Sequence, residues 1–284
     1  MPVPLKELVL FNNKDAFNDY VVNLIIKSKA FNNIEYIGIA GSIGRGEKTI
    51  FTPNLNDIDF IVIGKIVNSN LKEEIERKLC DITNTEFTDI TVIDRKLITK
   101  DYHCMHQYLF DFIHGNIELY STINISSHMK KLCEKKIKVT RFSVVNLFIT
   151  RSYCLDVNKE TNLDNVFLRY QLRKVILGYI DALLIVSSEY TTTNTIEKIE
   201  VIKGKLQFQT WLIDAEYYIN NYKDCDYIRF KEFTYHIYEM HSCMIKKECK
   251  LDILYLLFKL LAYPTRKKWR YTTDIFKLLF WRKK

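Results

Sequence analysis

The stretch IEYIGIAGSIGRGEKTIFTPNLNDIDFIVIG, residues 34–64, decides the fold of this chain. It begins with a short apolar run, residues 34–40, which predicts a buried β-strand. A second strand-like run, residues 57–63, begins with two carboxylates. Because successive side chains of a strand point to opposite faces, Asp57 and Asp59 are expected on the same face.

Two carboxylates held this close repel each other unless a cation lies between them, and the motif itself offers no such cation. Mg²⁺ prefers an all-oxygen environment of this kind and keeps positions open for water and phosphate. Between the two runs, Gly41 and Ser42 lie at a predicted strand-to-helix turn, where backbone N–H groups and a hydroxyl can bind an anion. Arg45 adds a positive charge to the same turn. A phosphate-binding turn beside a carboxylate pair indicates phosphoryl or nucleotidyl transfer.

These residues resemble the signature of the DNA polymerase β-like nucleotidyltransferase superfamily. The segment GSIGRGE, residues 41–47, is most similar to the bacterial minimal and aminoglycoside nucleotidyltransferases of that superfamily. The resemblance covers roughly the first 125 residues and implies a third carboxylate on a neighbouring strand. Asp89, in the strand-like run 86–93, matches that position, whereas Asp94 has the opposite strand parity. Residues 51–56 hold the extra length that separates the two halves of the motif here, and a turn is expected there.

The resemblance implies a two-metal mechanism. Asp57 and Asp59 would hold both Mg²⁺ ions, and Asp89 would complete the site of the ion that activates the acceptor hydroxyl. Ser42 and the Gly41 backbone would hold the phosphates of ATP or another nucleoside triphosphate, and Arg45 would neutralise their charge. The chain is therefore expected to be an Mg²⁺-dependent nucleotidyltransferase.

The expected fold class is α+β, with two domains. Residues 1–125 would form a polymerase β-like nucleotidyltransferase domain, a mixed sheet flanked by helices. Residues 126–284 would form an all-helical C-terminal domain, because apolar residues recur there at spacings of three and four. Helices are expected over residues 15–30, 70–80 and 103–114 in the first domain, and over 130–153, 165–188, 195–222, 227–249 and 251–263 in the second.

Composition places the chain among globular proteins, with 48% hydrophobic and 27% charged residues. Seven cysteines without a CxxC pair favour free thiols in a reducing compartment. The N-terminus shows no signal-peptide pattern, and no apolar run reaches the length of a transmembrane segment. A cytoplasmic location is expected.

The formal charge of +8 is concentrated in two segments. Residues 264–284 carry eight basic and one acidic residue, and residues 130–141 carry six basic and one acidic residue. Such segments could attract nucleotide phosphates, nucleic acid or an anionic membrane surface. Solvated helix faces explain each segment equally well when it is taken alone.

Three functional hypotheses follow. In the first and favoured one, the acceptor is a small molecule. In the second, it is RNA, protein or a second nucleotide, which would make the protein a toxin, a polymerase or a signalling cyclase. In the third, the fold is a non-catalytic nucleotide-binding module. The sequence predicts neither the acceptor nor the oligomeric state.

Overall fold

The structure is a computed structural model, and it describes residues 14–48, 57–83, 85, 87–160, 164–205, 210–252 and 254. Contacts divide the chain into two compact units, Met1–His103 with Tyr108–Ile137, and Cys104–Gln107 with Lys138–Lys284. The boundary expected after residue 125 falls inside α6 (Ile123–Glu134), which the contacts assign whole to the first unit. The turn expected over residues 51–56 and the basic segment 264–284 lie outside the described residues.

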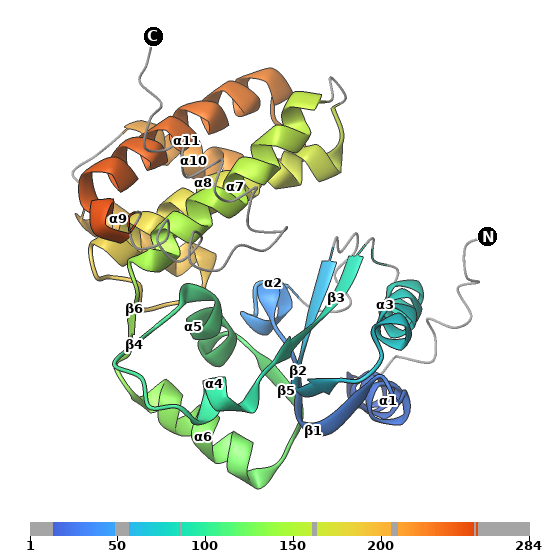
Figure 1. The fold of residues 1–284 in the computed structure, drawn as a ribbon. Coiled ribbons are helices and arrows are strands. Elements are labelled where there is room, and N and C mark those ends of the chain that lie inside the picture. The colour runs from blue at the N-terminus through green and yellow to red at the C-terminus, as the bar shows by residue number, and fades with distance from the viewer. Residues whose placement is uncertain are drawn as a thin grey trace. The chain divides into compact units, whose positions relative to one another are not determined.

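The first unit is built on a four-stranded sheet with the strand order β3-β2-β1-β5 (Figure 1). The strands are β1 (Phe31–Ile39), β2 (Asp57–Ile66), β3 (Phe87–Ile93) and β5 (Ile117–Ser121). Strand β1 pairs antiparallel with both β2 and β5, whereas β2 pairs parallel with β3. The prediction of an α+β chain with a mixed sheet is therefore confirmed.

Helices α1 (Lys14–Lys27) and α3 (Ser69–Thr83) pack on the sheet through their apolar stripes. Val21 and Ile25 of α1 and Leu79 of α3 are completely buried in the same core cluster as the inward side chains of β1, β2 and β3. Ile26, the next residue along α1, is 44% exposed. The reason is that one further residue turns the helix by 100°, away from the face that Ile25 buries.

The short helices of the first unit are α2 (Gly41–Gly44), α4 (Arg95–Thr99), α5 (Gln107–His114) and α6. The helix predicted over residues 103–114 is wrong in its first part. Cys104 and Met105 form a strand, β4, that pairs in parallel with β6 (Lys138–Val139), and the helix begins only at Gln107. A partner more than 30 residues away in sequence thus overrides the local helical pattern.

The second unit consists mainly of α7 (Phe142–Glu160), α8 (Val166–Val186), α9 (Thr195–Lys205), α10 (Thr210–Asn221) and α11 (Tyr227–Glu248). Helix α8 is the central element, since it contacts each of the other four. The predicted helix 130–153 is in fact α6, the strand β6 and α7, so the expectation of an all-helical region is wrong at β6. The predicted helix 195–222 is α9 and α10, and most of the predicted helix 251–263 lies outside the described residues.

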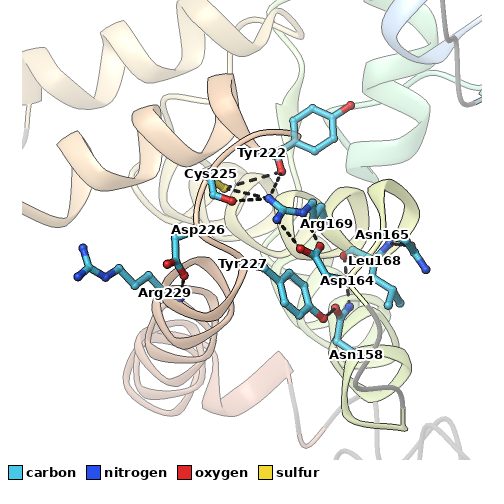
Figure 2. Close-up of polar contacts among 10 residues, drawn as sticks. All are labelled: Asn158, Asp164, Asn165, Leu168, Arg169, Tyr222, Cys225, Asp226, Tyr227 and Arg229. Carbon is cyan, nitrogen blue, oxygen red and sulfur yellow. Dashed lines mark hydrogen bonds and ion pairs between the residues drawn. The ribbon is translucent and has the colours of Figure 1, made fainter.

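A buried arginine joins α8 to the turn between α10 and α11 (Figure 2). Arg169 forms a bidentate ion pair with Asp164, with Nε–Oδ1 and Nη2–Oδ2 distances of 2.5 and 2.6 Å. Its Nη1 donates to the carbonyl oxygens of Tyr222, at 3.2 Å, and Cys225, at 2.5 Å. One turn later, Arg173 donates to a carbonyl in the last turn of α10. Arg173 thus satisfies a carbonyl group that the end of α10 leaves without an intrahelical partner, and Arg169 satisfies two carbonyl groups of the turn that follows.

The cysteines and the helix lengths were also predicted from the sequence. All seven cysteines are free thiols, as predicted. Among the helices of the described residues, none combines the length and the apolar character that crossing a membrane requires.

Candidate functional site

Strand register brings the three predicted carboxylates to one face of the sheet. Asp59 and Asp89 are direct partners in the parallel ladder of β2 and β3, and Asp57 precedes Asp59 by two residues. Directly opposed residues of paired strands project to the same side, so the three side chains share a face. The burial pattern agrees, because Ile58 and Ile90 are buried on the opposite face while the carboxylates are partly or largely exposed.

Asp59 lies directly against the turn that was predicted to bind phosphate. The backbone N–H of Ala40 donates to the carbonyl oxygen of Asp59 at 2.8 Å. Gly41 has a φ of +65°, and a Cβ built there would lie only 2.2 Å from Oδ2 of Asp59. Only glycine allows the backbone and the carboxylate to approach so closely at this conformation. The carboxylate pair and the Gly41 turn are therefore one continuous site.

The first turn of α2 carries the amides and the hydroxyl of the predicted phosphate cradle, and α2 packs beside β2 (Figure 1). The first helical bond runs from the Gly44 N–H to the Ala40 carbonyl at 3.0 Å, so the N–H groups of Gly41, Ser42 and Ile43 have no acceptor within the helix. The Ser42 carbonyl accepts the Glu47 N–H at 2.9 Å, which closes the turn after the helix. These groups lie where an anion beside Asp59 could reach them.

Arg45 is held within the turn by an ion pair. Its Nη2 lies 2.9 Å from Oε2 of Glu47, and the two side chains are 23% and 15% exposed. The predicted role of Arg45 in neutralising phosphates would therefore be shared with Glu47. The structure gives this arginine a second purpose, which is to hold the segment after α2 in place.

Asp89 contacts a cation that the sequence motif did not reveal. Its Oδ1 lies 3.6 Å from Nζ of Lys72, and its Oδ2 accepts a hydrogen bond from the Thr91 hydroxyl at 3.2 Å. Lys72 also pairs with Glu76 at 2.5 Å, four residues further along α3. This i,i+4 pair can be recognised in the sequence. Its position beside Asp89 cannot, because it depends on how α3 packs against β3.

Tyr108 of α5 is a further residue at the site that sequence reasoning missed. Its hydroxyl hydrogen-bonds with Thr91, and both Asp59 and Asp89 act on it electrostatically. Burial raises the pKa of Tyr108, the Thr91 hydrogen bond opposes that rise, and the two carboxylates add to it. The side chain is still 48% exposed, so a bound molecule could reach its ring.

The carboxylates fit a divalent cation in chemistry and in register, but they do not converge. Within the described ranges, no group of three or more His, Cys, Asp or Glu side chains lies close enough together to hold a metal ion. The oxygens of Asp89 are directed to Lys72 and Thr91, as given above. Asp57, Asp59 and Asp89 could therefore hold Mg²⁺ together only if Asp89 exchanged a partner.

Comparison with known proteins does not assign the chain to a family. No protein-family model matches this sequence, and a search of curated proteins finds none with significant similarity. The function is therefore inferred from the Gly41 turn and from the acidic face beside it.

Proposed function

We propose that this protein is an Mg²⁺-dependent nucleotidyltransferase that moves a nucleoside monophosphate, AMP from ATP in the favoured case, onto an acceptor hydroxyl. The observation that carries the proposal is the contact between Asp59 and Gly41. It puts a turn with anion-binding amides directly beside a carboxylate that is in register with Asp89. Transfer of a nucleotide from a metal-bound triphosphate requires this juxtaposition.

The fold within this proposal is the polymerase β-like nucleotidyltransferase fold. Three features support it, namely a mixed sheet, a Gly-Ser turn leaving β1, and paired carboxylates at the start of the neighbouring strand β2. The third carboxylate, on β3, belongs to the same arrangement.

Each residue of the site has a role in the proposed reaction. Asp57 and Asp59 would hold the cations, and Asp89 would join them as the third ligand. Bound Mg²⁺ would supply the positive charge that stabilises the phosphates in the transition state and makes the acceptor hydroxyl more acidic. Gly41 and Ser42 would orient the triphosphate. The acceptor hydroxyl would give its proton to Asp89, and its oxygen would form a new ester bond to the α-phosphorus. The bond between that phosphorus and the oxygen bridging to the β-phosphate would break, and pyrophosphate would leave with the electron pair.

The acceptor is proposed to be a small molecule, on the basis of residues 41–47. RNA is the second candidate, and a surface observation favours it. Lys130, Lys131, Lys135 and Lys136, in and directly after α6, are all exposed. Exposed lysines clustered on one segment suit an acceptor with many phosphates.

Transfer of label from ATP labelled at the α-phosphate tests the proposal. The protein, Mg²⁺ and labelled ATP are incubated separately with the small-molecule, RNA and protein fractions of a cell extract. We expect label in one fraction, and none when the label is at the γ-phosphate, because pyrophosphate leaves. Asp59→Asn should reduce transfer by about a thousandfold or more, since it removes a charge that acts in the transition state.

Asp94→Asn is the matched control. The Asp94 carboxylate caps α4 by accepting from the Lys96 N–H at 2.8 Å, and asparagine preserves such a cap. Full transfer by Asp59→Asn would remove this residue from the mechanism. ATP binding without transfer from any nucleoside triphosphate would favour the non-catalytic nucleotide-binding module instead.

A further inference from the structure

Lys72 is fixed in place beside Asp89 by a chain of contacts from α3 to the edge of the sheet. Oε1 of Glu76 lies 2.5 Å from Nζ of Lys72 and also accepts the backbone N–H of Ile90 at 2.7 Å. Strand β3 ends the sheet, so Glu76 covers an amide that an edge strand would otherwise expose. The Lys72 side chain is only 19% exposed, against 55% for Lys78 on the same helix. The ammonium group is therefore held at this position.

Both oxygens of Asp89 already have partners within the chain. Lys72 lies 3.6 Å from Oδ1, and the Thr91 hydroxyl donates to Oδ2. A divalent cation bound by Asp89 would lie a few ångströms from the Lys72 ammonium. Like charges at such a separation repel strongly when solvent screens them only in part. Lys72 and a divalent cation would therefore compete for the same carboxylate.

We infer that Lys72 is a displaceable counter-ion that keeps Asp89 from binding metal until a divalent cation replaces it. When the cation arrives, the ammonium keeps its pair with Glu76 and gives up Asp89. Asp57, Asp59 and Asp89 then bind the cation together only when its concentration is high enough to displace Lys72 from Asp89. The inference rests on the proposed function in one respect, since it takes Asp89 as a metal ligand.

Binding of Mn²⁺, measured by the electron paramagnetic resonance of the free ion, tests the inference without any need for turnover. The full chain is titrated in the absence of nucleotide as wild type, Lys72→Met and Lys78→Met. Lys78 is the matched control because it lies on the same helix and pairs with Glu74 at 3.0 Å, again with i,i+4 spacing. We expect Lys72→Met to tighten Mn²⁺ binding roughly tenfold. Lys78→Met should change it by less than about twofold, since exposed charges are screened.

A double variant tests whether the gain in Mn²⁺ affinity comes from Asp89 or from another residue such as Glu76. If the gain comes from Asp89, adding Asp89→Asn to Lys72→Met removes it. If the gain survives, it does not come from Asp89 and the inference is overturned. Lys72→Gln, which removes the charge and keeps a donor for Glu76, replaces Lys72→Met if that variant fails to fold.

The remaining outcomes distinguish this inference from the proposed function. Equal Mn²⁺ affinity in wild type and Lys72→Met overturns the competition and leaves the metal site standing. Weaker binding by Lys72→Met also overturns it, because Lys72 would then be orienting Asp89 for the metal. If no variant binds Mn²⁺ saturably, both the inference and the two-metal proposal fall.

Discussion

The two units of this protein use charged side chains in opposite ways. In the helical unit, the guanidinium of Arg169 is matched by the carboxylate of Asp164 and by two carbonyl oxygens, at distances of 2.5 to 3.2 Å. In the sheet unit, strand register aligns the carboxylates of Asp57, Asp59 and Asp89 on one face. Lys72 reaches Asp89, but at 3.6 Å and on a carboxylate that is 65% exposed.

This difference contrasts a charge that donates to buried carbonyl groups with carboxylates that lie side by side at the edge of the sheet. Arg169 connects α8 to the turn between α10 and α11 through its bonds to two carbonyl oxygens, and removing it leaves these groups without a donor. Like charges aligned on neighbouring strands repel each other, and in the proposed function a bound cation would relieve this repulsion. Stability measurements on the two regions should therefore give effects of very different size.

Arg169→Met should have the largest effect. It leaves the Tyr222 and Cys225 carbonyls and the Asp164 carboxylate without their donor, in a place where the arginine is only 9% exposed. We expect the free energy of unfolding to fall by about 2–4 kcal/mol, mainly because two carbonyl groups lose their donor, since Asp164 itself is 45% exposed. Urea denaturation of the full chain measures it. Lys223→Met, which removes an exposed cation from the same turn, should cost less than about 0.5 kcal/mol, and equal losses would contradict the comparison.

The second effect concerns acid and His241. This side chain is fully buried, between the rings of Phe148 at 5.3 Å and Tyr179 at 5.6 Å. Burial lowers the pKa of His241 to about 3, and the charge of Arg151 adds to this shift. Because the pKa is about 6.5 in the unfolded chain, the stabilisation is complete above pH 6.5 and is lost as the pH falls towards 3.

The expected loss for His241 is up to about 1.4 kcal/mol per pH unit in this window, or roughly 2 kcal/mol between pH 6.5 and 5. Urea midpoints at the two pH values measure it, and His241→Phe should flatten the dependence. The exposed His236 serves as the control, since His236→Phe should leave the pH dependence as it is. A wild-type and a His241→Phe protein with the same slope would show that this histidine does not titrate on unfolding.

Much of the fold followed from local patterns. Strand alternation placed Asp57 and Asp59 on one face, and helical periodicity located α8 and α11 to within two residues at each end. Asp89 was assigned through the resemblance to the nucleotidyltransferases, and its position beside Asp59 depends on the parallel pairing of β2 with β3. For the strand alternation and the two helices, the deciding interactions lie within a few residues of the chain.

What could not be predicted depends on partners far apart in sequence. The strand β4 exists because Met105 pairs with Val139, so the helical pattern around residue 104 misled. The pairing of Lys72 with Asp89 depends on packing between α3 and β3, and the place of Tyr108 depends on the return of α5 to Thr91. Neither contact can be recognised from the spacing of residues in the sequence, although both determine the surroundings of Asp89.

Two glycines with similar backbones give the third test, on the sheet unit. Gly41 and Gly46 have φ values of +65° and +73°, so alanine should cost about 1 kcal/mol at either position through backbone strain. A methyl group at Gly41 would also lie 2.2 Å from Oδ2 of Asp59, whereas nothing lies within 4 Å of one at Gly46. Gly41→Ala should therefore cost about 1 kcal/mol more than Gly46→Ala and should weaken Mn²⁺ binding. Equal losses of unfolding free energy at the two glycines, with unchanged Mn²⁺ binding, would show that the contact between Gly41 and Asp59 does not matter for the site.

The smallest effect is expected for Lys72→Met, and it should depend on the cation. Without divalent ions the variant loses an ion pair with a largely exposed carboxylate, while Glu76 keeps its bond to the Ile90 N–H. The free energy of unfolding should fall by about 1 kcal/mol or less. In about 10 mM Mg²⁺ the loss should shrink or reverse, because a tenfold gain in cation affinity stabilises the folded state by up to about 1.4 kcal/mol.

Paired urea titrations with Mg²⁺ and with a chelator measure this dependence, and Arg169→Met is the reference because its loss should be the same in both. An Mg²⁺-independent loss for Lys72→Met as large as that for Arg169→Met would make Lys72 a structural cation. The distinction between the two charged regions would then disappear.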